Sequence, residues 1–180
     1  MVKQTKKDWS FIDNKALQKK IADTTKIMSV FYITDQQRGL DPLFVKELRR
    51  IYVLYAASIV EVLLVCLFKK GGFSIEDVVY KDPSPLPEKY QSGKDTIVLA
   101  RQGKKQRPER RLTLDVLIGF FEELGRLPVN LVKRLRVMKD VRNTFHLGKS
   151  RQGRQLNSKS LEAAATAILE VAEIVRKELK

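Results

Sequence analysis

The feature that most constrains the fold is an apolar run of 18 residues from Ile51 to Phe68, IYVLYAASIVEVLLVCLF, in which Glu61 is the only charged residue. This length is at the short limit for a membrane-spanning helix, and a carboxylate in the middle of a bilayer is costly. A core helix of a globular domain accommodates the run better, with membrane insertion as the alternative. The segment therefore predicts a long buried helix that begins after Asp41 as N-cap, has Pro42 in its first turn and ends before Gly71.

Four other segments show the apolar spacing of helices, and residues 71–112 differ from them in composition. This stretch holds four of the six prolines and four of the nine glycines. We expect an all-α fold, a bundle of about five helices in one domain over residues 1–180, with a loop-rich insertion at 71–112. The predicted helices span about 13–33, 41–69, 114–124, 130–147 and 160–180.

Local patterns inside the insertion are weaker. Residues 74–79 are compatible with a short helical turn, and 96–100 and 111–114 have some strand character, so a small β-hairpin around the intervening residues is one interpretation. Thr113 and Asn130 are the expected N-caps of the third and fourth helices.

The chain carries 35 Lys+Arg against 21 Asp+Glu, a net charge of +14. Such a field attracts polyanions, of which RNA, DNA and anionic membranes are the common ones. Residues 101–111, RQGKKQRPERR, hold six cations and one acid, and form either a solvated mobile loop or a phosphate-binding arm. The candidate RNA contacts are Lys104, Lys105, Arg107, Arg110 and Arg111, extended by Lys149 and Arg151.

Several chemistries find no support in the sequence. Cys66 is the only cysteine, which excludes a disulfide within the chain and fits a reducing cytoplasm. The first residues, MVKQTKKDWS, are polar, so we expect no signal peptide. P-loop, GxGxxG, HExxH and EF-hand patterns are absent, as is a cluster of carboxylates for Mg²⁺, so no cofactor and no metal are expected.

The single histidine lies in the stretch KDVRNTFHLG, at position 146. On a helix through this stretch, Arg142 falls within an apolar stripe and His146 lies one turn further at its edge. An arginine on an apolar face must be paired or must face a cleft. The two side chains are therefore either structural or converge on a phosphate. Glu61 also needs a cation, and Arg142 is its predicted partner, as a salt bridge or as part of a site. The stripe comprises Leu131, Leu135, Met138, Val141 and Phe145.

The motif Arg142-Asn143-x-x-His146, in the penultimate helix, resembles the signature of the HEPN superfamily, although the spacing is shorter than the commonest one. The segment YAASIVEVLL, with Ser58 and Glu61, is similar to an early helix of such domains. The resemblance covers the motif, the helix order and the size. It implies a metal-independent endoribonuclease that dimerises, with Arg142, His146 and Asn143 as catalytic residues and Glu61 in support.

The implied chemistry suits these residues, because an imidazole can transfer protons near neutral pH and a guanidinium can stabilise charge on a phosphorane. A two-fold dimer would supply the second histidine that acid and base catalysis together require. The resemblance also implies a toxin or antiviral defence effector with an antitoxin or other partner protein. A non-catalytic RNA-binding or assembly module is the alternative, and a DNA-binding regulator using two consecutive helices is a third interpretation.

Overall fold

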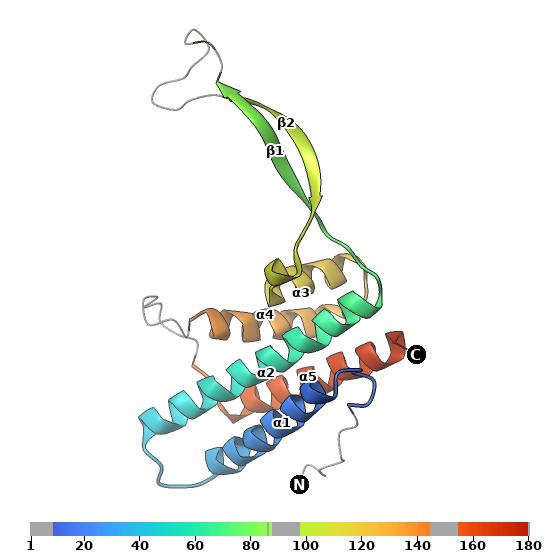
Figure 1. Ribbon diagram of the computed structural model, residues 1–180. Helices are drawn as coiled ribbons and strands as arrows, with labels where there is room; N and C mark the ends of the chain where they lie inside the picture. The colour runs from blue at the N-terminus through green and yellow to red at the C-terminus, as the bar shows by residue number, and fades with distance from the viewer. Residues whose placement is uncertain (1–8, 86, 88–97, 145–154, 180) are drawn as a thin grey trace. The chain divides into compact units, whose positions relative to one another are not determined.

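The computed structural model describes residues 9–85, 87, 98–144 and 155–179. In this part of the chain it has five α-helices and one two-stranded antiparallel sheet (Figure 1). The chain divides into a helical unit, residues 1–71 and 113–180, and a hairpin unit, residues 72–112. The mostly helical fold confirms the predicted class at that level, and the second unit coincides with the predicted insertion.

Helix α2 (Pro42–Lys70) is the centre of the helical unit, because it packs against each of the other four helices (Figure 1). Eleven of its residues are buried, among them Leu63 and Leu64 with no exposed surface. The Asp41 side chain accepts a hydrogen bond from the Phe44 N–H, as the predicted N-cap should. The surrounding helices are α1 (Lys15–Asp35), α3 (Leu114–Glu123), α4 (Val129–Asn143) and α5 (Ser158–Glu178).

In the described part of the chain, α2 is also the one helix long and apolar enough to cross a membrane. More than half of its apolar stretch is nevertheless buried inside the helical unit. This is the behaviour of the core helix of a soluble protein, and it agrees with the interpretation favoured by the carboxylate of Glu61.

Helix α4 differs from its prediction at both ends. It begins at Val129 after Pro128, which occupies the N-cap position, so Asn130 is not the cap. Its last residue is Asn143, with Thr144 as C-cap, four residues before the predicted end. The predicted apolar stripe is otherwise confirmed, since its members Leu131, Leu135, Met138 and Val141 are buried, and Phe145 lies outside the described residues.

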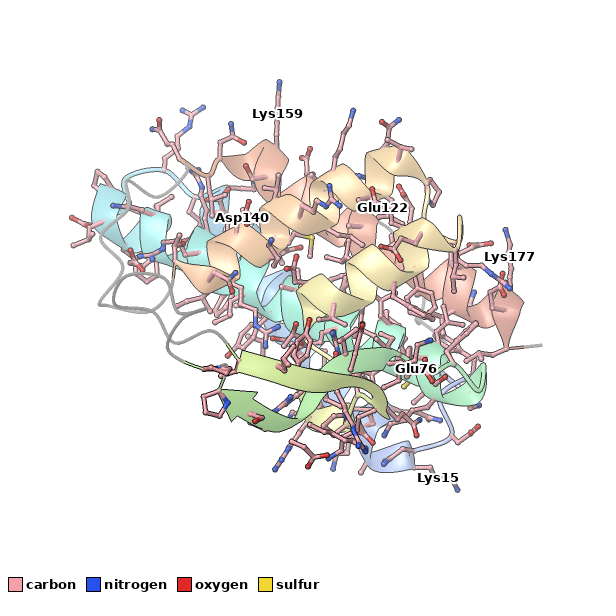
Figure 2. All side chains as sticks on the ribbon, turned by 90° about the horizontal axis from the view of Figure 1, so that it is seen from above. Lys15, Glu76, Glu122, Asp140, Lys159 and Lys177 are labelled. Atoms are coloured by element: carbon pink, nitrogen blue, oxygen red, sulfur yellow. The ribbon has the colours of Figure 1, made fainter. Side chains whose placement is uncertain are left out.

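Ion pairs connect α3 to α4 along their solvent side. Glu122 of α3, labelled in Figure 2, pairs with Arg136 at 2.5 Å, and Asp115 accepts a hydrogen bond from Lys139 at 2.9 Å. The hydrogen bond to Asp115 raises the pKa of the Lys139 ammonium. The two ion pairs thus hold α3 and α4 in register.

The hairpin unit consists of β1 (Glu76–Pro85) paired antiparallel with β2 (Val98–Gln106). The register places Lys81 opposite Arg101 and breaks between Lys81 and Ser84, where Asp82 has a φ of 51°. The predicted helical turn at 74–79 is wrong: most of these residues belong to β1, whose alternating and β-branched side chains suit a strand.

The predicted strand at 111–114 is also wrong. Residues Glu109–Arg111 form a short 3-10 helix, η2, and α3 begins at Leu114. A hairpin is present, but its strands are 76–85 and 98–106, because the second strand pairs with the segment that precedes it in the sequence and not with the residues that follow the basic run.

Candidate functional site

The predicted pair of Glu61 and Arg142 is present in the helical unit. Glu61 Oε2 lies 2.8 Å from Arg142 Nη1, and Glu61 Oε1 accepts a hydrogen bond from the Leu114 N–H at 2.9 Å. The side chains of Arg142 and Glu61 are 35% and 21% exposed. One carboxylate on α2 therefore holds the last turn of α4 and the first turn of α3.

The capping of α3 explains why Glu61 is tolerated among apolar neighbours. Thr113 occupies the N-cap position as predicted, but its side chain makes no capping hydrogen bond. Glu61 provides the acceptor from another helix, at a helix end where negative charge is favoured. With both oxygens engaged, Glu61 acts as an anchor for Arg142 and not as a free base.

This arrangement predicts different costs for two substitutions of Glu61. In Glu61→Gln the amide oxygen can still accept from the Leu114 N–H, so we expect only the loss of a partly exposed ion pair, about 1 kcal/mol. In Glu61→Ala the N–H of Leu114 also loses its acceptor, so the loss should reach about 2 kcal/mol. Urea unfolding measures both free energies, and equal costs would show that the capping hydrogen bond contributes nothing.

Of the two other residues of the motif, the structure describes Asn143 and not His146. Asn143 is the last residue of α4 and is exposed. His146 lies outside the described residues, as do Lys149 and Arg151. Because α4 ends at Asn143, the predicted i, i+4 proximity of Arg142 and His146 on one helix stays a prediction.

Two adjacent arginines of α2 bind backbone carbonyls near the two ends of segment 145–154. Arg50 binds Thr144 before the segment, and Arg49 binds Leu156 after it. On the first side, Arg50 Nη2 donates to the carbonyl of Thr144 at 3.2 Å, and Arg50 Nη1 donates to both carboxylate oxygens of Glu47. A cation at the C-terminus of α4 satisfies a carbonyl that has no partner within the helix. The end of α4, next to Arg142, is thereby tied to α2.

On the other side, Arg49 pairs with Asp35, whose side chain is fully buried. Arg49 Nε lies 2.6 Å from Asp35 Oδ1, and Arg49 Nη1 donates to the carbonyl of Leu156 at 3.1 Å. The Ser158 hydroxyl donates to Asp35 Oδ2 at 2.7 Å. This network joins α1, α2 and the start of α5.

This network was not predicted, because Asp35 follows the predicted end of the first helix and reads as a loop residue. The available signal was the pair Arg49-Arg50 immediately before the apolar run, since two cations at the end of a core helix require partners. Nothing in the sequence indicated which carboxylate would be buried with them.

The basic run of the hairpin is not a mobile loop over its first half. Residues 101–106 belong to β2, and Lys104 pairs with Glu76 at 3.1 Å. Arg107 donates twice to Asp77 Oδ1, at 2.8 and 2.6 Å, and this hydrogen bonding lowers the pKa of the Asp77 carboxyl. Of the predicted RNA contacts, Lys105 is exposed in β2, while Arg110 and Arg111 lie in η2.

Metal ligation and thiol chemistry find no support in the described residues. No group of three or more His, Cys, Asp or Glu side chains among them could hold a metal ion. Burial raises the pKa of the Cys66 thiol, which lowers the fraction of reactive thiolate. Cys66 therefore fits a packing role in α2.

Comparison of the chain with protein-family models, with curated proteins and with solved structures gave no match.

Proposed function

We propose that the protein is an RNA-directed, HEPN-like endoribonuclease that cleaves without a metal ion. The observation that carries the proposal is Arg142, which Glu61 anchors in the last turn of α4, four residues before the only histidine of the chain. Glu61 engages one terminal nitrogen of the guanidinium, and the side chain remains partly exposed. An arginine held in this way is preorganised to meet a phosphate near His146.

In the proposed reaction, the His146 imidazole removes the proton from a ribose 2′-OH, since imidazoles can transfer protons near neutral pH. The 2′-oxygen attacks the adjacent phosphorus, and the bond to the 5′-oxygen of the next nucleotide breaks. Arg142 stabilises the charge on the equatorial phosphorane oxygens. The leaving oxygen takes up a proton, so the products end in a 2′,3′-cyclic phosphate and a 5′-OH.

One imidazole per chain cannot act as base and acid in the same step. The proposal therefore includes a two-fold homodimer in which the fourth helices approach each other and each copy contributes Arg142, Asn143 and His146. It also places the protein in the cytoplasm, as a toxin or antiviral defence effector with an antitoxin or other partner protein. The net charge of +14 supports RNA as the partner.

Incubation of the purified protein with mixed RNA in EDTA tests this function. We expect cleavage, products with 2′,3′-cyclic phosphate ends, and no cleavage of DNA, which lacks the attacking 2′-OH. Light scattering on the same preparation should give twice the chain mass of 20.7 kDa. An active protein that is strictly monomeric would contradict the shared site, and the absence of cleavage under all conditions would contradict the enzyme.

A non-catalytic RNA-binding or assembly module is the second candidate, and one observation favours it. Glu61 uses both oxygens to connect α2, α3 and α4, which is what a purely structural ion pair would do. Under this alternative the protein binds RNA and leaves it intact, with the same affinity in wild type and in His146→Ala. The EDTA experiment separates the two candidates.

A further inference from the structure

The two faces of the hairpin differ in charge, and the strand register decides which basic residue lies on which face. Side chains alternate along a strand, and residues directly opposite in an antiparallel pair share a face. One face carries Lys81, Arg101 and Lys105, with Gly103 between the two residues of β2. We call this the Lys81 face.

The opposite face has little free charge. It carries the exposed side chains of Val78 and Tyr80 with their cross-strand partners Lys104 and Gln102. Its one cation in this stretch, Lys104, is 3.1 Å from Glu76, which is labelled at the start of the hairpin in Figure 2. Neighbours in the sequence, Lys104 and Lys105, therefore lie in different electrostatic surroundings.

The Lys81 face concentrates positive charge at a cost to the hairpin itself. Lys81 is directly opposite Arg101, and like charges in this position destabilise a strand pair. The acid on this face is Asp77, opposite Lys105, and Asp77 already accepts two hydrogen bonds from Arg107. Lys81, Arg101 and Lys105 are all exposed, and none has an ion-pair partner among the described residues.

Lys81 reaches from β1 toward the other two cations across Gly103. A Cβ atom at position 103 would lie 3.4 Å from Cε and 3.8 Å from Cδ of Lys81, so the Lys81 chain crosses the ladder over this glycine. Its ammonium group is thus brought toward β2 between Arg101 and Lys105, which are separated by about 13 Å along the strand. The result is a row of cations along one face of the ribbon.

We propose that the Lys81 face binds the phosphate backbone of single-stranded RNA. The charge complementarity carries this inference, because an unpaired cross-strand pair of cations gains most from a polyanion. The inference rests on the proposed RNA-directed function and adds to it a second phosphate-binding surface, on the hairpin unit. It also replaces the expectation that Lys104 and Arg107 are contacts, since both are occupied by carboxylates of β1.

The test compares two neighbouring lysines of the same strand. Binding of a fluorescein-labelled oligouridine is measured by anisotropy at several KCl concentrations, with His146→Ala in all proteins so that no cleavage occurs. Each phosphate contact contributes about 0.7 to the slope of log affinity against log salt. We expect Lys105→Gln to lower the slope by about 0.7 and the double variant Lys81→Gln/Arg101→Gln by about 1.4. Lys104→Gln, which removes the same charge from the other face, should leave the slope unchanged.

Two readouts separate the ways in which the inference could fail. Circular dichroism should show that Lys81→Gln retains the wild-type fold, because it relieves the repulsion from Arg101. Equal slopes for Lys104→Gln and Lys105→Gln would overturn the Lys81 face while RNA binding stands. Failure of the parent protein to bind oligouridine would overturn the RNA-directed function itself, and equal binding of single-stranded RNA and duplex DNA would overturn the assignment to single-stranded RNA.

Discussion

Replacing Arg49 with alanine is expected to lower the free energy of unfolding by about 3 kcal/mol. The reason is the Asp35 carboxylate, whose side chain has no exposed surface and which Arg49 contacts at 2.6 Å. Without Arg49, Asp35 keeps the hydrogen bond from the Ser158 hydroxyl but remains a buried charge without a counter-ion. Urea unfolding followed by circular dichroism at the helical band measures the change.

Two further variants make this result specific. Lys46 is exposed on the same helix, so Lys46→Ala removes an equal charge and should change stability by no more than about 0.5 kcal/mol. Adding Asp35→Asn to Arg49→Ala should recover part of the loss, because the neutral amide can still accept from Ser158 and no longer needs a cation. If Arg49→Ala costs no more than Lys46→Ala, the buried pair does not hold α1 to α2.

Replacing His146 with alanine is expected to slow RNA cleavage by about 10²–10⁴-fold, the usual contribution of a general acid or base. His146 is the only imidazole of the chain, so no other side chain has an ordinary pKa near neutrality to replace it. The measurement is the initial rate on a labelled RNA in EDTA at saturating substrate. The rate should fall without a matching change in RNA affinity.

The matched control is Lys133→Ala, which removes an exposed cation from α4. Its cleavage rate should stay near that of the wild type, which shows that a general loss of positive charge is not the cause. The urea unfolding curve of His146→Ala should coincide with that of the wild type. Unchanged cleavage by a folded His146→Ala protein would remove the catalytic assignment, and Arg142 would then have only its structural role with Glu61.

The central helix could be predicted from the sequence because its need to be buried follows from its own residues. An apolar run with a single carboxylate has to be buried in almost any fold, and the residues around Asp41 and Pro42 define its start. The pair of Glu61 and Arg142 could be predicted for a related reason: each charge lies on an apolar helical face, and each needs a partner of opposite sign. Because few charged residues lie on apolar helical faces in this sequence, Glu61 and Arg142 could be matched to each other.

The hairpin was predicted less well, because strand pairing is a relation between distant segments. The residues of β1 and those of the basic run each have weak local preferences, and only their pairing makes Lys81 face Arg101. A register shifted by one residue would place Lys104 on the Lys81 face in place of Lys105. The sequence therefore indicated a basic segment without indicating its binding face.

Sequence alone determined the positive charge, the helical class, the central helix α2 and the need of Glu61 for a cation, since these follow from composition and from periodicity within one segment. Tertiary structure decided the features that depend on contacts between segments. These are the burial of Asp35 beside Arg49, the capping of α3 by Glu61 and the placement of Lys105, and not Lys104, on the face of Lys81. The physical reason is that burial and register are set by the partner that a segment meets, and neighbouring residues do not encode that partner.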